Sequence, residues 1–287
     1  MKINVPLIAA VHSLPSFGRS ALAVIDPVLS SMGTQVCPIP TSVLSSHTGG
    51  LGEVVKKDLN SYIKESFIKY KELGIKFDCI FSGYFGSPEQ IDELLFAYEE
   101  NKDALKVVDP VMGDHGKTYK FFTPELIEKI KTLVSRANVI TPNLTEAYIL
   151  NDLPFDSCSL SAGETKKMLL SLAGKGPEYV IVTGVPMVDN SLYNIGYDAS
   201  INSFFKVKCS YVPVSYPGTG DIFASVVVGE ILMGKSLAIA CESATRFCEL
   251  AIKSTYSYGA DTRFGVVFEP YLSTLANSLS GSSYELL

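Results

Sequence analysis

SYPGTGDIFASVVVGEILMG (Ser215–Gly234) places two glycines, a threonine and an aspartate directly before a long apolar run. The run predicts a buried helix over 219–233. Gly218 and Gly220 permit positive φ values and a close approach of the backbone to a ligand. We expect the N–H groups of 218–221 to point into one concavity at the helix N-terminus, where they can bind a phosphate group.

Asp221 has two interpretations in this position. It can be an ordinary residue of the first helical turn, where the helix dipole favours a carboxylate and Asp caps well. It can also be a base that removes the proton of a hydroxyl group while that oxygen attacks phosphorus beside the anion site. The rest of the chain decides between the two.

The composition is that of a globular protein with a sizeable core. The 287 residues are 47% hydrophobic and 19% charged, and the formal net charge is -6. This negative charge disfavours nucleic acids and anionic membranes as partners, so any phosphate must be bound by local groups. The apolar run 5–11 is short and contains Pro6, which favours a buried strand over a signal peptide. The six cysteines form no C-x-x-C, and we expect buried thiols in a cytoplasmic protein.

Short apolar runs alternate with helical periodicity along the chain. We predict strands at 6–11, 35–39, 79–83, 105–110, 138–143 and 179–184, and β-hairpin material at 192–212. We predict helices near 22–32, 53–73, 88–101, 123–135, 161–172, 219–233 and 236–256, a helix after Asn143 or Thr145, and a weaker one near 270–279. The alternation predicts an α/β fold, with a central, mainly parallel β-sheet covered by helices on both faces, and one domain over 1–287.

Polar residues follow most of the predicted strands. Ligands of open α/β sheets bind beyond the carboxyl ends of the strands, so we expect these residues to lie at one edge with GTGD. They are His12-Ser13, the Ser45–Gly50 loop, Ser82-Gly83-Tyr84, Asp109, Thr141-Pro142-Asn143 and Thr183-Gly184.

Several motifs together resemble the pyridoxal/pyridoxamine (vitamin B6) kinase family of the ribokinase-like superfamily, nearly from end to end. They are GTGD at 218–221, DPVMGD at 109–114, TPNLTE at 141–146, SSHTGG at 45–50 and SGY at 82–84. The resemblance implies a ribokinase-like fold and ATP-dependent phosphorylation of the 5′-hydroxymethyl group of pyridoxal, pyridoxamine or pyridoxine, in pyridoxal 5′-phosphate salvage. It also implies a homodimer.

The resemblance assigns roles to individual residues. Asp221 becomes the general base, and Gly218, Thr219 and Gly220 form the anion hole. The vitamer contacts are Ser13, Thr48, Tyr84 and Asp221. The ATP contacts are Asp109, Asp114, Tyr119, Thr141, Glu146, Thr183, Gly184 and Val212. Asn143 and Glu146 hold Mg²⁺, largely through water, and the resemblance leaves open whether a monovalent cation assists.

Three alternatives remain open. The short loop Ser13–Gly18 resembles hydroxymethylpyrimidine kinases of thiamin synthesis, although those enzymes usually carry Cys where Asp221 stands. A non-catalytic binder of pyridoxal phosphate or nucleotide would not need Asp221 and Glu146. Sugar and nucleoside kinases commonly carry a separate β-lid early in the chain, for which residues 33–60 look too short and too helical.

Phe17 and Arg19 each have two interpretations. Phe17 can stack on a pyridine ring or pack beneath its loop. Arg19 can bind a phosphate or pair with a carboxylate.

Overall fold

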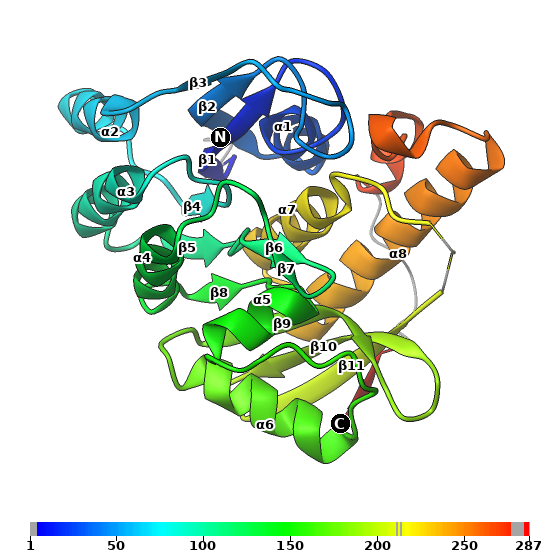
Figure 1. Cartoon of the computed structure of the whole chain (residues 1–287). Helices are drawn as coiled ribbons and strands as arrows, with labels where there is room; N and C mark the ends of the chain where they lie inside the picture. The colour runs from blue at the N-terminus through cyan, green and yellow to red at the C-terminus, as the bar shows by residue number, and fades with distance from the viewer. Residues whose placement is uncertain (1–4, 211, 213, 277–283, 287) are drawn as a thin grey trace.

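A computed structural model of the chain describes residues 5–210, 212, 214–276 and 284–286. Within these residues one ten-stranded sheet has the order β12-β11-β10-β9-β8-β5-β4-β1-β2-β3 (Figure 1). Its strands are β1 (Leu7–Pro15), β2 (Gln35–Leu44), β3 (Lys56–Asp58), β4 (Cys79–Ser82), β5 (Leu105–Val108), β8 (Val139–Ile140), β9 (Tyr179–Pro186), β10 (Leu192–Asp198), β11 (Ser203–Cys209) and β12 (Glu285–Leu286). A separate hairpin pairs β6 (Gly113–Asp114) with β7 (Lys117–Thr118).

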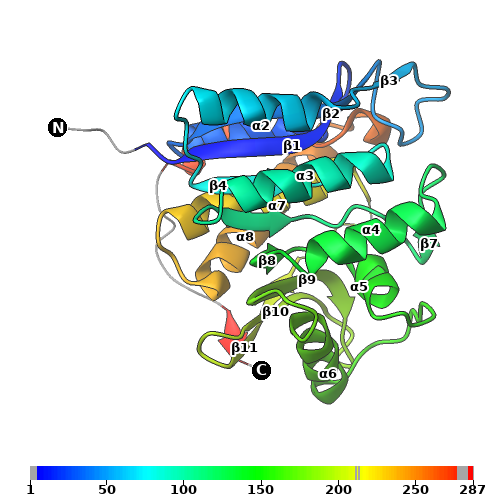
Figure 2. The same ribbon diagram turned by 90° about the vertical axis from the view of Figure 1, so that its left-hand side faces the viewer.

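Helices cover both faces of the sheet. They are α1 (Leu22–Ser31), α2 (Tyr62–Glu72), α3 (Pro88–Glu100), α4 (Pro124–Val134), α5 (Leu144–Leu150), α6 (Ala162–Ala173), α7 (Thr219–Leu232) and α8 (Leu237–Ser257), with 3₁₀ turns at η1 (Thr262–Phe264) and η2 (Glu269–Thr274). Helices α2 to α6 lie over one face, and α1, α7 and α8 lie over the other (Figure 2). The predicted α/β fold is confirmed.

Successive side chains of β1 pack into the helix layers on opposite faces of the sheet. Ala9 and Val11 pack with α2 to α6, while Ile8 and Ala10 pack with α1 and α7. A strand buried on both faces must be apolar at every position, which explains the continuous run that the sequence shows.

The central ladder β2-β1-β4-β5-β8-β9 is parallel throughout, and antiparallel strands extend it at both edges. The carboxyl ends of these parallel strands therefore meet at one edge of the sheet. The β6–β7 hairpin lies in front of that edge in Figure 1.

The structure corrects several predictions. The expected helix 53–73 begins only at Tyr62, and β3 occupies part of its place as an antiparallel partner of β2. Residues 33–60 are therefore largely extended rather than helical. The weak helix near 270–279 is the 3₁₀ turn Glu269–Thr274, and 277–279 lie outside the described residues. Cys158 is exposed, and Cys37 and Cys209 are only partly buried, so not all thiols are core groups.

No helix within the described ranges is long and apolar enough to cross a bilayer. The assignment of all of 1–287 to one domain stays a prediction.

Candidate active site

Asp221 lies in the first turn of α7, directly behind a glycine turn. Gly218 is the N-cap with φ of 85°, and a Cβ atom there would lie 2.0 Å from the carbonyl oxygen of Arg19. Both its conformation and its close contact therefore demand glycine. Gly220 does not use the positive φ that glycine permits, and a Cβ atom there would meet no atom within 4 Å. Its missing side chain leaves open space beside the turn.

Two groups from the start of the chain contact the carboxylate of Asp221. The N–H of Ala21 donates a hydrogen bond to Oδ2 at 2.8 Å, and Nε2 of His12 lies 3.3 Å from Oδ1. Ala21 adopts φ 53° and ψ -137°, a conformation that non-glycine residues rarely hold. The turn before α1 is thus shaped to present a donor to Asp221.

Asp109 and Glu146 are buried carboxyl groups that follow β5 and β8, with 7% and 3% of their surfaces exposed. Burial, and next the charge of Asp221, raise the pKa of Asp109 to about 8. Burial, and next the charge of Asp109, raise the pKa of Glu146 well above its usual value. The charge of Asp221 thus acts on Asp109 and that of Asp109 acts on Glu146, so the three carboxyl groups lie near one another.

Glu146 is tied into the backbone rather than solvated. It forms a capping box with Asn143, in which the Asn143 side chain accepts from the Glu146 N–H at 3.0 Å and Glu146 Oε2 accepts from the Asn143 N–H at 2.9 Å. Glu146 Oε1 also accepts from the Met112 N–H at 3.0 Å, and Asn143 Nδ2 donates to the Gly113 carbonyl at 2.8 Å. Hydrogen bonds thus join the TPNLTE segment (141–146) to the DPVMGD segment (109–114) at the N-terminus of α5.

The remaining ATP-side residues lie around this junction. Thr141 is buried at the end of β8, and Asn143 and Thr183 pair in an isolated parallel bridge. The N–H of Gly184 donates to the Asn194 side chain at 3.0 Å. The β6–β7 hairpin carries Asp114 and continues to Tyr119, which is 44% exposed; Val212 lies between β11 and α7.

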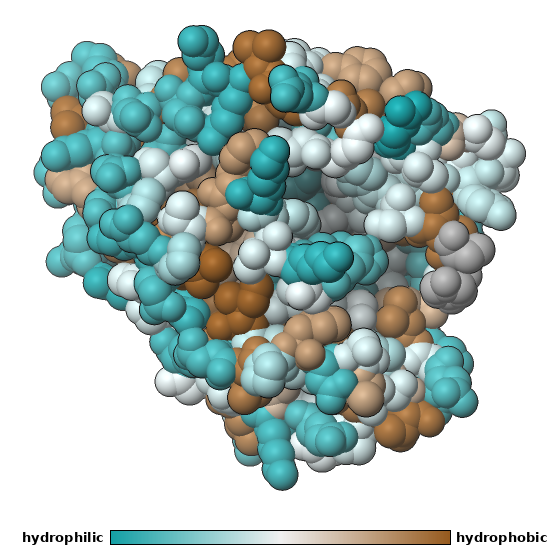
Figure 3. Space-filling view, in the orientation of Figure 1, coloured by the Kyte–Doolittle hydropathy of each residue, from teal (hydrophilic) through white to brown (hydrophobic). Residues whose placement is uncertain are grey.

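Two of the predicted vitamer residues belong to β1 and to the loop after β2. Ser13 is buried at the end of β1, and Thr48 is exposed in a loop where a Cβ atom on Gly49 would lie 3.4 Å from Pro217. The loop after β2 thus reaches the turn that carries GTGD. Figure 3 shows a hollow on this face between the loops after β1 and β2 and the β6–β7 hairpin.

Tyr84 is positioned by neighbours on two sides. Lys56 of β3 places its ammonium group 5.4 Å from the centre of the Tyr84 ring, and the ring packs edge-on against Phe122. The Thr41 hydroxyl donates to the Tyr84 carbonyl at 3.0 Å.

Phe17 and Arg19 bind the C-terminal 3₁₀ turns in this structure. The Phe17 ring packs edge-on against Phe264 at 5.4 Å, and Arg19 Nε donates to Glu269 Oε1 at 2.6 Å. Of the two interpretations of Arg19, the structure shows carboxylate pairing.

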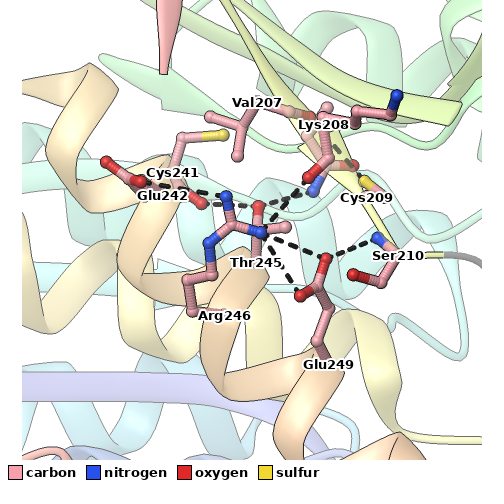
Figure 4. Close-up of polar contacts among 10 residues, drawn as sticks. Val207, Lys208, Cys209, Ser210, Cys241, Glu242, Thr245, Arg246 and Glu249 are labelled. Atoms are coloured by element: carbon pink, nitrogen blue, oxygen red, sulfur yellow. Dashed lines mark hydrogen bonds and ion pairs between the residues drawn. The ribbon is translucent and has the colours of Figure 1, made fainter. Parts of the chain in front are cut away.

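A polar network holds the segment that leads into the glycine turn (Figure 4). Glu249 of α8 accepts from the Ser210 N–H at 2.6 Å, and Arg246 lies between Glu249 and the carbonyl of Lys208. The Cys248 thiol donates to the Thr219 carbonyl at 3.7 Å. Helix α8 thereby fixes both ends of the loop that contains Val212.

Three residues that contact the candidate site residues Asp221 and Tyr84 were not predicted from the sequence. His12 was visible only as a polar residue at a strand end, because its partner Asp221 is remote in sequence. Lys56 was hidden by the helical interpretation of 53–73, since Lys56–Asp58 shows no alternation of apolar and polar residues. Ala21 contributes a backbone N–H, for which no side-chain signal exists.

Comparisons with known proteins agree with this geometry. The sequence profile of the phosphomethylpyrimidine kinase family matches residues 27–265. Pyridoxal kinase PdxY of Actinobacillus pleuropneumoniae is 30% identical over 224 residues, which cover 71% of this chain and 73% of that protein. The crystal structure of pyridoxal kinase from Lactobacillus plantarum superposes with a TM-score of 0.86 at 27% identity, covering 94% of this chain and 96% of that one.

A Bacteroides thetaiotaomicron protein assigned as a phosphomethylpyrimidine kinase is more similar still. Its rhombohedral crystal form has a TM-score of 0.95 at 41% identity and covers 100% of this chain and 99% of that one. Its orthorhombic form, with pyridoxal, has a TM-score of 0.94. The chain belongs to the phosphomethylpyrimidine kinase family and, within the ribokinase-like superfamily, to the pyridoxal kinases.

Proposed function

We propose that this protein transfers the γ-phosphoryl group of ATP to the 5′-hydroxymethyl group of a vitamin B6 vitamer. The observation that carries the proposal is the placement of Asp221 at the start of α7, beside the Gly218 turn and close to Asp109 and Glu146. The pyridoxal kinases among its relatives and the pyridoxal in the Bacteroides crystal support the choice of substrate.

The residues suggest how the reaction proceeds. Asp221 accepts the proton of the vitamer hydroxyl while that oxygen attacks the γ-phosphorus, and ADP leaves. The N–H groups of 218–221 stabilise the negative charge that develops on the transferred group. The Ala21 N–H keeps Asp221 oriented, and Ser13, Thr48 and Tyr84 hold the vitamer.

The carboxyl groups fit Mg²⁺ as cofactor. Asp109 and Glu146 are both buried, and burial, followed by the charge of a neighbouring carboxylate, raises the pKa of each, so a cation bound there would offset an unfavourable negative charge. Each Glu146 oxygen accepts a backbone hydrogen bond and keeps lone pairs for a water molecule, which suits a hydrated ion held by Asn143 and Glu146. When bound, Mg²⁺ neutralises the charge that these groups share with the triphosphate.

A second candidate function is phosphorylation of hydroxymethylpyrimidine. The family profile that matches residues 27–265 is named for phosphomethylpyrimidine kinase, whose substrate is also a substituted pyrimidine, and Ser13–Gly18 has the short form of the hydroxymethylpyrimidine kinases. Asp221, where those enzymes usually carry Cys, favours the vitamer kinase. We also propose a homodimer, which rests on the resemblance, and a cytoplasmic location, which rests on the absence of a C-x-x-C motif among the six cysteines.

A coupled ATPase assay tests both activities. Pyridoxal, pyridoxamine, pyridoxine and hydroxymethylpyrimidine are each supplied with saturating Mg-ATP, and the phosphorylated product is identified by mass. We expect product from at least one vitamer with a higher kcat/KM than from hydroxymethylpyrimidine. No vitamer phosphate would overturn the proposal, and product from hydroxymethylpyrimidine alone would establish the second candidate.

A further inference from the structure

We propose that His12 is a positioning residue for the base: its buried ring donates its Nε2–H to Asp221 Oδ1 and holds the carboxylate ready for the substrate hydroxyl. Its catalytic consequence rests on the function proposed above. The contact itself can be tested without any substrate.

The ring of His12 is oriented by its own neighbour. Its exposed fraction is 4%, and Nδ1 accepts a hydrogen bond from the Ser13 N–H at 2.8 Å. A nitrogen that accepts carries no proton in the neutral ring, so the proton is assigned to Nε2. Nε2 is the atom that faces Asp221.

Among the described residues, no other group forms a hydrogen bond with Nε2 of His12. It is buried without a partner in full hydrogen-bond geometry, and Asp221 Oδ1 is 3.3 Å away. A buried donor without a partner is costly, and the carboxylate of Asp221 lies within reach as its acceptor. Oδ2 is already fixed by the Ala21 N–H, so the His12 contact leaves Asp221 little freedom to turn.

Gly83 makes the room for this ring. A Cβ atom on Gly83 would lie 2.2 Å from His12 Cδ2 and 2.3 Å from Nε2, and the third nearest atom also belongs to His12. Gly83 has no positive φ, so its backbone does not require glycine. Glycine is therefore required at position 83 of the SGY motif because any side chain there would clash with the His12 ring.

Burial keeps the ring neutral. It lowers the pKa of His12, an effect that the charge of Asp221 only partly opposes. A neutral donor orients Asp221 without forming a full ion pair, which would make the carboxylate a weaker base. The neutral ring of His12 can therefore hold the Asp221 carboxylate in place without the loss of base strength that an ion pair would cause.

Kinetics of two His12 variants test the role. Removing the donor in His12→Leu should lower kcat roughly 10- to 100-fold, the worth of one hydrogen bond to a charged group, with KM for vitamer and ATP nearly unchanged. His12→Gln, which offers an amide N–H in a similar place, should recover part of the loss. Thr165→Val, a buried polar change in α6, is the control for packing and should keep wild-type kcat. Normal kcat in a folded His12→Leu protein, or equal losses in Leu and Gln, would overturn the proposal.

A double-mutant cycle keeps the test informative if His12→Leu folds poorly. Gly83→Ala should reduce kcat in the wild-type background and cost little more in His12→Ala, because the clashing ring is then absent. Equal costs of Gly83→Ala in both backgrounds would contradict the proposed cradle.

Imidazole ¹⁵N NMR of the protein without substrate separates this inference from the proposed function. We expect the Nε2–H tautomer, with a signal that shifts in Asp221→Asn. If wild-type protein phosphorylates no vitamer while the signal responds, only the function fails. If the signal belongs to the Nδ1–H tautomer or ignores Asp221→Asn, the inference fails.

Discussion

The N–H of Ala21 donates a 2.8 Å hydrogen bond to Oδ2 of Asp221, although the two residues are 200 positions apart. The turn before α1 and the first turn of α7 therefore form one unit. Ala21 holds a strained backbone conformation for this contact, which is common where geometry serves function.

Asp221→Asn separates the role of a base from that of a structural hydrogen-bond acceptor in the first turn of α7. Asn can accept the Ala21 hydrogen bond and suits the first turn, although its one oxygen cannot also accept from His12 Nε2, so the melting temperature should fall only modestly. It cannot take up the substrate proton, so kcat for the vitamer should fall roughly 10²- to 10⁴-fold while vitamer affinity stays close to wild type. Turnover, affinity and melting temperature are measured on the one variant, and near-normal turnover would remove Asp221 from the mechanism.

Asp109→Asn should stabilise the protein in alkaline solution. The pKa of Asp109 rises from 3.8 to about 8 on folding, so the folded state binds more protons than the unfolded chain. The free energy of unfolding contributed by this group therefore falls as pH rises from about 4 to about 8. Without Mg²⁺ or nucleotide, we expect the variant to melt higher than wild type at pH 8 and close to it at pH 4.5. Asp103→Asn, an exposed carboxylate, is the control; a variant less stable than wild type at pH 8 would contradict the assignment.

Glu146→Gln should raise the Mg²⁺ concentration needed for half-maximal activity and should also lower stability. The carboxylate accepts the N–H groups of Asn143 and Met112, and an amide offers only one oxygen, so one buried donor is left unpaired at a cost of about 1–3 kcal/mol. Chain geometry supplies a matched control: Glu164 closes the same capping box with Ser161 at the exposed start of α6. Glu164→Gln should leave the Mg²⁺ titration at its wild-type position. An unchanged titration in Glu146→Gln would exclude Glu146 from the metal site.

Lys56→Met should weaken vitamer binding. The Lys56 ammonium lies over the rings of Tyr84 and Phe121 and pairs with Asp58 at 2.9 Å, so its loss frees the Tyr84 ring. We expect KM for the vitamer to rise roughly 3- to 10-fold with a smaller change in kcat, in line with one cation–π contact. Lys64→Met removes a similar contact with Phe96 and should leave KM unchanged. Equal KM values in the two variants would show that Lys56 does not position Tyr84.

Much of this architecture could be predicted because apolar strands and helix signals are local. The buried β1 and the capping residue Asn143 were both readable from their immediate neighbours. The motifs predicted the strand-end cluster because parallel strands bring their carboxyl ends together.

What could not be predicted depends on contacts distant in sequence or on the backbone. Lys56–Asp58 is polar at every position and becomes a strand only because β2 offers it an edge. The His12–Asp221 contact has no local signal. Residue type alone also could not show which of the two glycines adopts a positive φ: Gly218 does, while Gly220 lies in the first turn of α7.

The order in which the layers form has a consequence for synthesis of the chain. The apolar face of α1, with Leu22, Ile25 and Leu29, packs against Ala224 and Val228 of α7, which are synthesised about 200 residues later. The opposite face can be covered progressively, since α2 to α6 follow the strands on which they pack. One face of the nascent sheet therefore stays uncovered until α7 (Thr219–Leu232) has been synthesised, and that face is where a chaperone would bind.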